Sequence, residues 1–487
     1  MDTNALKTLD ACQQKLTELV ASVSRNVAPG DVPDVAPVAR ELSAIYVRMG
    51  DLLLAANDLQ NTATCYAAAQ QLDAGLATTE TWQRKYKTFL AALLKQNPLD
   101  TALLKLLGET NRRLRDYSEA LECFKRARQL DPKDADSLWA IATVQQNMGD
   151  DDAATETFRR VIAVKPLLTK AANKAPPDFS VLILFAPGLG NTPTEYLTEN
   201  QPYETNTYPV LAGVQHDAAL LKQHAQVIFN AVSEADQDSS ILPDVARIVA
   251  ESGLPVINPP DKIAATTRDR IPELLKGIPH CRIARIVRHT AGDPADAASL
   301  QTKIPFAAPL LVRPAGTHGG EGFESAENFK ALEKILKAAP DKDHFLIEYI
   351  DYKSPDGNFR KYRFFFIDGR IMPYHLAISG RWKVHHETTE MDMHQWMQDE
   401  EKAFLENPAA VFSPQNYQAL NDIRKAVGLE YFGIDCAIDR NGDLVVFEAN
   451  ATMLAHGMNH QYPYKTPFVE AIRAAFNAML QKYAGKI

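Results

Sequence analysis

The sequence predicts a multi-domain protein in which an all-α solenoid of repeated helical hairpins precedes a region of mixed α/β and α+β architecture. Two observations lead to this fold class. The first 170 residues show a 34-residue period and no convincing strand, whereas strand-like and helix-like segments alternate from residue 180 onward. We therefore expect a helical domain over 1–170, a linker over 171–178, an α/β subdomain over 179–290 and a final region over 291–487.

Composition narrows the class of protein further. The chain has 487 residues, 46% hydrophobic and 23% charged, which is typical of soluble globular domains and too long for one core. No apolar run approaches the roughly 18 residues that span a bilayer, and the N-terminus lacks a signal-peptide pattern. The net charge of −9 argues against binding to nucleic acid or to anionic membranes. Five scattered cysteines without a CxxC pair favour reduced thiols, so we expect a cytoplasmic protein.

The period is clearest when residues 101–134 are superposed on residues 135–168. Small residues coincide at two positions, followed by an aromatic residue and a proline, in the pairs Gly108/Ala142, Ala120/Ala154, Phe124/Phe158 and Pro132/Pro166. Small residues let two antiparallel helices approach closely, the aromatic ring fills the groove to the next helix, and proline ends the second helix. Residues 43–76 keep a weaker version of the pattern.

This pattern resembles the tetratricopeptide repeat, with a non-repetitive helical bundle as the alternative. Solenoids of this kind bind peptides, dimerise or support a neighbouring domain, and nothing in the sequence names the ligand.

From residue 180 onward, apolar strand-like segments alternate with helix-like segments. In the α/β subdomain we expect strands over 179–187, 225–232, 255–260 and 281–288, with helices over 241–253 and 266–276. Strands separated by helices of this length favour a parallel sheet. Farther along we expect a strand–loop–strand unit over 310–323, a helix over 325–339, a strand over 344–350, and a long strand over 359–378 interrupted by a turn at 368–369.

A glycine-rich loop follows the strand that ends near Arg313. The segment GTHGGEG (316–322) has glycine at four of seven positions, which frees backbone N–H groups to surround an anion beside the arginine. It has neither the lysine–serine ending of a P-loop nor the GxGxxG spacing that opens a helix. In isolation, the loop is as compatible with a mobile hairpin that binds no ligand as with a phosphate lid.

A β-hairpin is predicted over residues 433–450 from the dipeptide Asn441-Gly442, which favours a two-residue turn. Such a turn places Ile438 opposite Val445 and Asp435 opposite Glu448. Asn450, two residues beyond Glu448, then points to the same face as the two carboxylates.

Opposed carboxylates destabilise a sheet unless a cation lies between them. Two carboxylates and an amide are oxygen ligands that suit a hard ion such as Mg²⁺ or Mn²⁺. The alternative is a solvated sheet face with three unrelated polar residues, which the apolar neighbours Ile434, Val446 and Phe447 disfavour. The hairpin therefore predicts a metal site formed by Asp435, Glu448 and Asn450.

These features follow one another in the order cationic strand end, glycine loop, strand ending in a carboxylate (Glu348), and Asp…Glu-x-Asn hairpin. In this order and spacing, residues 180–480 resemble the ATP-grasp superfamily. The segment FEANATM (447–453) is most similar to the branch that contains glutathione synthetase and peptide or protein amino-acid ligases. The resemblance implies an ATP-grasp fold and an ATP- and Mg²⁺-dependent carboxylate–amine ligase.

The resemblance also implies roles for single residues. Arg313 and Arg270 match phosphate-binding cations that are usually lysines in the family, and both keep the charge. Gly319 and Gly320 match the lid over the phosphates. Arg363 matches an arginine that acts with Arg313 on the transferring phosphoryl group.

The adenine and metal contacts are implied in the same way. Three consecutive residues match the adenine contacts, namely Glu348, Tyr349 and Ile350, and the three hairpin ligands match those that hold Mg²⁺ against the phosphates. The family's usual aspartate two residues before Arg363 is Lys361 in this chain, which weakens the match for that arginine.

The implied reaction forms an amide or peptide bond through an acylphosphate, and it needs no covalent nucleophile on the protein. The implied partners are an amino-acid or peptide substrate, and a peptide, protein or carrier substrate that the repeat domain recruits. Whether the chain forms a homodimer is left open. Two other functions also stay open: a non-catalytic ATP-binding scaffold, and an ATP-grasp phosphotransferase.

Residues that contact the substrate are the least determined by the sequence. A cluster of basic side chains follows the long strand, and a further histidine follows the metal hairpin; the candidates are His375, Arg381, Lys383, His385 and His456. Such side chains can bind the carboxylates of a substrate. Each histidine is also explained as an ordinary surface or core residue.

Overall fold

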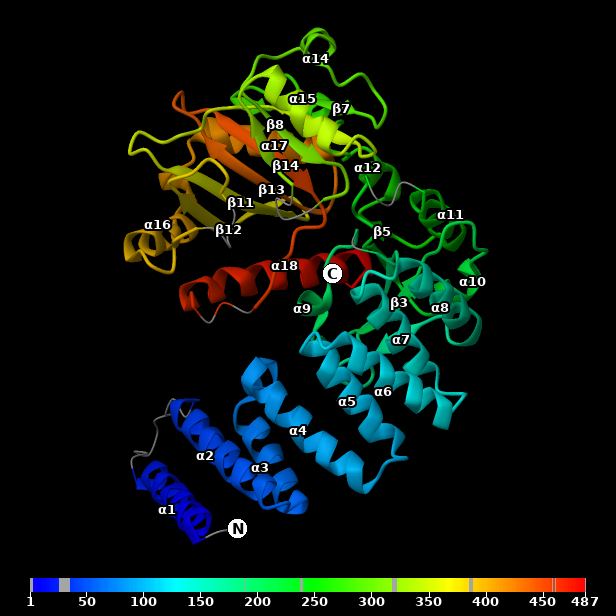
Figure 1. The fold of residues 1–487 in the computed structure, drawn as a ribbon, viewed down its shortest axis with the longest axis vertical. Coiled ribbons are helices and arrows are strands. Elements are labelled where there is room, and N and C mark those ends of the chain that lie inside the picture. Colours follow the sequence, from blue (N-terminus) through cyan, green and yellow to red (C-terminus); the bar gives the residue numbers. More distant parts are fainter. Residues whose placement is uncertain are drawn as a thin grey trace. The chain divides into compact units, whose positions relative to one another are not determined.

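A computed structural model of the chain describes residues 3–25, 36–188, 190–236, 240–317, 322–384, 389–457, 459 and 461–486. It divides into two compact units, Met1–Lys165 and Pro166–Ile487. The predicted fold class, a helical repeat region followed by a region of mixed helices and sheets, is confirmed (Figure 1). None of the helices in the described ranges has both the length and the apolar character needed to cross a bilayer.

The first unit is helical throughout its described residues. Its elements are α1 (Thr3–Arg25), α2 (Ala36–Ala55), α3 (Leu59–Leu72), the 3₁₀ helix η1 (Ala74–Thr78), α4 (Glu80–Gln96), α5 (Thr101–Arg113), α6 (Tyr117–Leu130), α7 (Ala135–Asn147) and α8 (Asp151–Val164). The hairpins α5–α6 and α7–α8 coincide with the two clearest predicted repeats. Aspartate side chains cap several of these helices: Asp100 caps α5 and Asp134 caps α7 by accepting backbone N–H groups.

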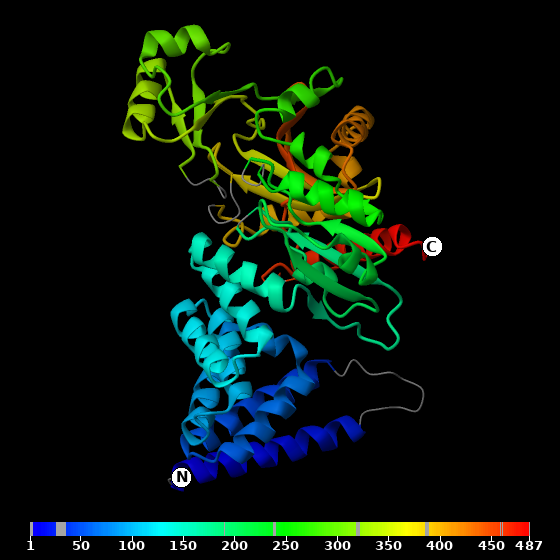
Figure 2. The ribbon, with the colours of Figure 1, turned by 90° about the vertical axis from the view of Figure 1, so that its right-hand side faces the viewer.

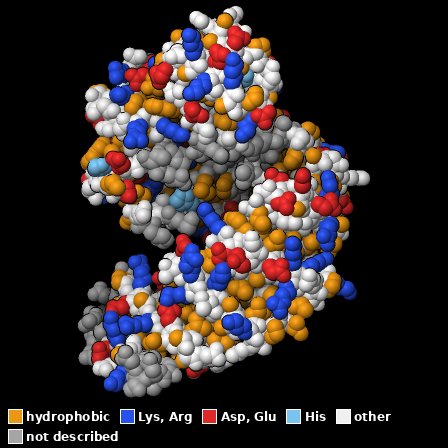
Figure 3. All heavy atoms as spheres, in the orientation of Figure 1, with side chains coloured by type: hydrophobic (Ala, Val, Ile, Leu, Met, Phe, Trp, Pro, Cys, Tyr) orange, Lys and Arg blue, Asp and Glu red, His pale blue; other side chains and the backbone are white. Residues whose placement is uncertain are grey.

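Close packing within the hairpins depends on the small residues of the repeat. A Cβ added to Gly108 would lie 2.8 Å from the ring of Phe124, and a Cβ added to Gly50 would lie 2.4 Å from Tyr66. In the last hairpin the equivalent residues are Ala142 and Phe158, and both are fully buried. On the face drawn in Figure 3, acidic and basic side chains are interspersed over the surface of the molecule.

The second unit begins with a five-stranded sheet of order β1-β3-β2-β4-β5. Its strands are β1 (Leu168–Lys170), β2 (Ser180–Phe185), β3 (Glu204–Pro209), β4 (Val227–Asn230) and β5 (Val256–Ile257), and all pairs are parallel except β1–β3. The associated helices are α9 (Glu195–Thr198), α10 (Ala218–Gln223), α11 (Leu242–Ser252), α12 (Pro260–Ala264) and α13 (Ile271–Leu274). Because β1 pairs with β3, residues 168–170 belong to this unit, and the division lies five residues before the predicted boundary at 170.

The predicted helix over 266–276 is confirmed only in part. Helix α13 lies within this range, whereas residues 266–270, between α12 and α13, form a connection without a regular helix. Proline explains the interruption: Pro272 lacks a backbone N–H and would clash in the interior of a longer helix, whereas the first turn of α13 accepts it.

A second, antiparallel sheet has the order β7-β10-β8-β9. Its strands are β7 (Ile286–His289), β8 (Leu310–Pro314), β9 (Glu324–Ala326) and β10 (His344–Glu348), and α14 (Ala297–Lys303) and α15 (Phe329–Ala338) cover one face (Figure 2). The apolar stripe of α15 packs Leu332 and Leu336 into a core with Leu310, Val312 and Leu346.

The third sheet has the order β12-β11-β13-β14-β6. Its strands are β6 (Cys281–Ile283), β11 (Phe359–Ile367), β12 (Arg370–Ser379), β13 (Tyr431–Ile438) and β14 (Leu444–Asn450). The helices that follow or separate them are α16 (Gln395–Glu406), η3 (Pro408–Ala410), α17 (Pro414–Val427), η4 (Pro463–Lys465) and α18 (Thr466–Tyr483). The predicted single strand over 281–288 is two strands in two sheets, since β6 pairs with β14 and β7 pairs with β10.

The first and third sheets share a core to which α18 contributes. Phe476 of α18 packs against Phe229 of β4 and Tyr431 of β13, with ring centroids 5.1 and 5.2 Å apart. The buried amide of Asn258 completes this junction: its Nδ2 donates to the Tyr431 carbonyl oxygen at 2.7 Å, and its Oδ1 accepts from the Tyr431 N–H at 2.9 Å. These contacts tie β5 to β13 and fix the third sheet beside the first.

The close contact at Gly108 predicts that alanine at this position lowers stability, which is the opposite of what helix propensity predicts. Gly→Ala inside a helix normally stabilises by up to about 1 kcal/mol. We expect Gly108→Ala to destabilise the first unit by about 1–3 kcal/mol, because the new methyl group overlaps the Phe124 ring. The melting temperature, followed by circular dichroism at the helical minimum, measures the change. Gly108→Ala combined with Phe124→Leu should be less destabilised than the sum of the single variants, and a stabilised Gly108→Ala chain would contradict the packing described.

Candidate functional site

A cavity of about 320 Å³ lies between the second and third sheets of the second unit. Its walls come from β7, β8 and β10, from β11, β13 and β14, and from the segments around 268, 382–384 and 452–454. Nine of the residues predicted for the site line it: Arg313, Glu348, Tyr349, Ile350, Arg363, Lys383, Asp435, Glu448 and Asn450. Segments far apart in the sequence therefore meet in one concave site, of the kind that binds a small-molecule ligand.

The turn that connects β13 and β14 differs from the predicted two-residue turn. Ile438 pairs with Leu444, and Ala437 takes Val445 as its partner, so the predicted pairing of Ile438 with Val445 is wrong. The reason is an extra residue in the turn. Residues 439–442 form a turn in which the Gly442 N–H donates to the Asp439 carbonyl oxygen, and Gly442 has a φ of +82°. A glycine in this left-handed conformation adds one residue to the connection.

A second irregularity restores the predicted carboxylate pair. The register shifts again between Asp435 and Cys436, which leaves Phe447 of β14 as an extra residue. The two shifts compensate, so Asp435 pairs directly with Glu448 as predicted. The bulge also brings Phe447 to the cavity wall beside Glu448.

The carboxylate of Asp435 is buried and neutralised by two cations of β11. Arg363 binds it with two hydrogen bonds, from Nε to Oδ1 at 2.6 Å and from Nη2 to Oδ2 at 2.9 Å, and Lys361 Nζ donates to Oδ2 at 2.9 Å. Asp435 is only 2% exposed. Burial raises the pKa of this carboxyl, but the charges of Arg363 and Lys361 outweigh burial and hold its pKa well below the usual range.

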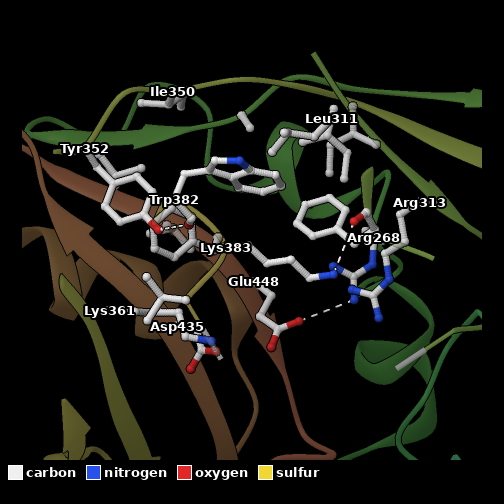
Figure 4. A pocket seen from close by; sticks show the side chains of 18 of the residues that line it. Arg268, Leu311, Arg313, Ile350, Tyr352, Lys361, Trp382, Lys383, Asp435 and Glu448 are labelled. Atoms are coloured by element: carbon white, nitrogen blue, oxygen red, sulfur yellow. Dashed lines mark hydrogen bonds and ion pairs between the residues drawn. The ribbon is translucent and has the colours of Figure 1, made fainter. Parts of the chain in front are cut away.

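Two more arginines approach the other carboxylate. Arg268 Nη2 lies 3.3 Å from Glu448 Oε2, and Arg313 of β8 lies beside it on the same side of the cavity (Figure 4). Burial and the neighbouring Arg268 lower the pKa of Arg313 to about 10, so it remains charged at neutral pH. Lys383 extends toward the same region in Figure 4, where it donates to the Phe323 carbonyl oxygen at 3.3 Å. An excess of positive charge thus faces the cavity.

The hairpin oxygens fit a hard divalent cation. Asp435 and Glu448 supply opposed carboxylates, and Asn450 Oδ1 accepts from Thr452, with the Thr452 Oγ1 at 2.9 Å. Oxygen donors from two carboxylates and an amide are the set that Mg²⁺ and Mn²⁺ prefer. Within the described ranges, His, Cys, Asp and Glu side chains form no group of three or more that could hold a metal ion, so a metal here would need Asn450 beside the two carboxylates.

The other wall contains Glu348, Tyr349 and Ile350. Both oxygens of Glu348 accept from Arg285, Oε2 from Nε at 2.9 Å and Oε1 from Nη2 at 2.8 Å. This hydrogen-bonded ion pair lowers the pKa of Glu348, which keeps it ionised and fixes its position. A carboxylate oxygen has two lone pairs, so Glu348 retains acceptor capacity toward the cavity.

Several predicted residues are not at the cavity. Arg270 is exposed and donates to the Ala264 carbonyl oxygen at 3.2 Å, and Arg381 is also exposed. His456 is half-buried in the loop after β14, where its carbonyl oxygen accepts from Asn459. Gly319, Gly320 and His385 lie outside the described residues.

Two cations of the site were not predicted. Arg268, two residues before Arg270, lines the cavity where Arg270 was expected. Residues 266–270 are not helical, so no helical period in the sequence indicates which arginine faces the cavity. Lys361 was noted only as a departure from the family pattern, yet it binds Asp435. The period-2 spacing of Lys361 and Arg363 on one strand is the signal that places both on one face.

His375 belongs to a buried polar cluster beside the cavity. Its Nδ1 lies 2.6 Å from Glu401 Oε1, and Lys465 Nζ lies 3.1 Å from the same oxygen. Tyr464 donates to Glu401 Oε2 at 2.6 Å. Burial, followed by the charge of Lys465, lowers the pKa of His375 to about 4, so the imidazole is neutral at pH 7.

Comparison with family models identifies the repeats. Residues 101–134 and residues 135–166 each match the tetratricopeptide repeat, so this stretch consists of tetratricopeptide repeats. A curated protein, Superkiller protein 3 of Schizosaccharomyces pombe, is 38% identical over 72 residues. That match covers 15% of this chain and spans 5% of the length of the curated relative.

Solved structures with similarity to the chain include three ligases or synthetases. They are the VanG D-Ala:D-Ser ligase from Enterococcus faecalis (14% identity, 63% of this chain and 98% of that chain, TM-score 0.37), the ATP-grasp ligase PsnB (15%, 61% and 99%, 0.36), and the D-cycloserine synthetase DcsG (13%, 61% and 99%, 0.37). At TM-scores this low the similarity supports no assignment by itself, so a functional assignment depends on the site.

The ion pairs predict unequal roles for the two opposed carboxylates in stability. Asp435→Asn leaves Lys361 and Arg363 buried without their anion, and we expect a loss of about 3–5 kcal/mol. Glu448→Gln, at a longer and more exposed contact with Arg268, should cost less than about 1 kcal/mol. Differential scanning calorimetry of both variants measures the difference. Equal stability of the two variants would contradict the electrostatic account of Asp435.

The depressed pKa of His375 predicts a loss of stability in mild acid. The unfolded histidine titrates near 6.5 and the folded one near 4, so the folded state is favoured above pH 6.5 and loses this contribution as the pH falls toward 4. The full effect is at most about 3 kcal/mol. Melting curves of the wild-type chain and of His375→Gln between about pH 7 and 4.5 should converge as the pH falls. A gap that is constant with pH would contradict the prediction.

Proposed function

We propose that the chain is an ATP- and Mg²⁺-dependent carboxylate–amine ligase of the ATP-grasp kind, which forms an amide or peptide bond through an acylphosphate. The observation that supports this most strongly is the meeting of four cations with the Asp435–Glu448 pair in one cavity. The cations are Arg268, Arg313, Lys361 and Arg363. Fixed positive charge of this density beside oxygen ligands for a metal matches a nucleoside triphosphate.

Each wall of the cavity has a distinct part in the proposal. Arg268 and Arg313 bind phosphate oxygens; the planar guanidinium of arginine suits phosphate, since it donates two parallel hydrogen bonds. Glu348 and the backbone of the two residues after it border the space proposed for the adenine ring of ATP. Asp435, Glu448 and Asn450 hold the metal, which when bound neutralises charge on the phosphates.

The proposed chemistry has two steps. A substrate carboxylate oxygen attacks the γ-phosphorus of ATP, the bond to the β-phosphate oxygen breaks, and ADP leaves. An amine nitrogen then attacks the acyl carbon, the carbon–oxygen bond to the phosphate breaks, and the products are an amide, inorganic phosphate and a proton. Arg363, held on Asp435 at one end of the cavity, supplies positive charge beside the transferring group.

The proposal includes a role for the repeats. Tetratricopeptide solenoids offer an extended surface to a partner, so we assign to them the recruitment of a peptide, protein or carrier that bears one of the two reacting groups. Lys383 is the candidate among the basic residues for contact with the substrate, because it alone among Arg381, Lys383 and His456 lines the cavity.

Glu448→Gln tests the metal site. Loss of the carboxylate should reduce Mg²⁺-dependent ADP release by at least about 100-fold, while the fold persists because the neutral amide is isosteric. The assay measures ADP release over pools of carboxylic acids and amino acids, with mass spectrometry to identify a condensed product. Glu251→Gln, an exposed position on α11, is the matched control. ADP release without a condensed product would favour the scaffold or phosphotransferase alternatives, and an unchanged rate in Glu448→Gln would remove the metal from this position.

Removal of the repeats tests their proposed role. A fragment beginning at Pro166 keeps β1, which pairs with β3, and contains the whole cavity. We expect this fragment to bind ATP and Mg²⁺ with the affinity of the full chain but to show a raised KM for the recruited substrate. Isothermal titration and steady-state kinetics measure the two quantities. A soluble fragment with full-length kcat/KM for that substrate would show that the repeats do not recruit it.

A further inference from the structure

The buried cluster around His375 has a defined protonation pattern. Glu401 Oε1 accepts from the backbone N–H of Leu376 at 3.0 Å and from Lys465 Nζ, which also lies 3.0 Å from His375 Nδ1. The 2.6 Å contact between His375 Nδ1 and Glu401 Oε1 places a proton on that nitrogen, since the Lys465 ammonium can direct its N–H groups to Glu401. An ionised carboxylate only accepts, so the shared proton must come from the imidazole. A neutral His375 protonated at Nδ1 presents a bare lone pair at Nε2.

This Nε2 acceptor has no hydrogen-bond donor among the described residues, although the atom is buried. A buried acceptor without a partner costs about 1–3 kcal/mol, so such groups call for an explanation. Both carboxylate oxygens of Glu401 accept hydrogen bonds, whereas the Nε2 atom of His375 has no partner within the described ranges. A missing N–H or O–H donor from a ligand is the simplest partner for this atom.

The position of His375 links the open acceptor to the cavity. His375 of β12 is the direct cross-strand partner of Arg363 on β11, and the strands have an irregular register at this point. Directly paired residues in an antiparallel sheet have Cβ atoms roughly 5 Å apart. His375 therefore projects from the same face of the sheet as Arg363, beside the cavity that Arg363 lines, although His375 is not itself one of the lining residues.

The charges around the acceptor favour a neutral donor. Lys465 is buried against Glu401 and against the rings of Tyr374 and Tyr462, at 5.6 and 6.0 Å from their centroids. Arg363 is the second cation near His375, and it is itself paired with Asp435. Glu401 and Asp435 offset these two charges, so neither carboxylate is left to pair with an ammonium group, whereas a neutral amine needs no such anion.

We propose that His375 Nε2 accepts an N–H from the attacking amine, and that the second substrate binds there as a neutral primary amine, such as the amino group of an amino acid or a peptide. This inference rests on the proposed ligase function. It assigns to Glu401 and Lys465 a positioning role, because they fix the tautomer and the orientation of the imidazole. The nitrogen lone pair of the amine is then free to attack the acyl carbon beside Arg363.

A spectroscopic experiment tests the geometry without any turnover. In the full chain labelled with ¹⁵N-histidine, long-range ¹H–¹⁵N spectra distinguish the two neutral tautomers, and the signal lost in His375→Gln is assigned to His375. We expect the Nδ1–H tautomer at pH 7. Glycinamide, added with ADP and Mg²⁺ as an amine probe, should shift the Nε2 resonance. An Nε2–H tautomer, a charged imidazolium, or no shift at saturating glycinamide would overturn the inference.

Kinetics separate this role from a merely structural one. With the carboxylate found by the ADP-release screen, His375→Gln should raise KM for the amine about tenfold or more, while hydroxylamine trapping of the acylphosphate stays within about twofold of wild type. The control is His216→Gln, at a buried histidine whose two nitrogens both have partners, Tyr208 and the Leu211 carbonyl oxygen. Equal losses in both half-reactions, or an unchanged amine KM, would contradict the assignment.

The two experiments also separate failure of the inference from failure of the proposed function. If no pool of substrates supports ADP release, the ligase proposal fails, and the glycinamide titration still decides whether Nε2 accepts an amine. If ligation occurs but His375→Gln behaves as His216→Gln does, the ligase proposal stands and the role of His375 is wrong.

Discussion

The buried charge of Asp435 is the constraint on which the site depends. A carboxylate that is 2% exposed cannot remain ionised without cations, and Lys361 and Arg363 meet this requirement from the adjacent strand. Both cations are thereby fixed in position, and both line the cavity. Glu448 differs from Asp435 because its partner, Arg268, lies on a loop and contacts it at 3.3 Å. Of the two carboxylates, Glu448 is therefore the more accessible to a ligand.

The scaffold places this charge where a ligand can reach it. Asn258 and Phe476 fasten the third sheet to the first through Tyr431 of β13, four residues before Asp435. The second sheet, with its own core beneath α14 and α15, closes the opposite side and contributes Arg313 and Glu348. The cavity is therefore a junction between separately packed bodies, a common location for binding sites.

The chain uses polar burial in two ways near this junction. The Arg285–Glu348 pair is half-exposed, and Arg285 donates to both carboxylate oxygens, so the pair serves mainly to position the wall. The cluster of His375, Glu401 and Lys465 is more deeply buried and leaves one acceptor atom open. Fully paired networks are explained by rigidity alone, whereas an unpaired acceptor beside a cationic cavity is better explained by a ligand.

The sequence by itself determined features that depend on local patterns: the helical repeats over 101–166 and the opposition of Asp435 and Glu448 on one hairpin. The pairing of Asp435 with Glu448 was predicted from a two-residue turn that the structure lacks. The prediction is nevertheless correct, because two register shifts of one residue cancel. Only the tertiary structure decided which of Arg268 and Arg270 faces the cavity, since an irregular loop has no period to read. Likewise, it alone joined His375 to Glu401 and Lys465, 26 and 90 residues away in the sequence, because contacts between separate elements arise from packing and leave no local pattern.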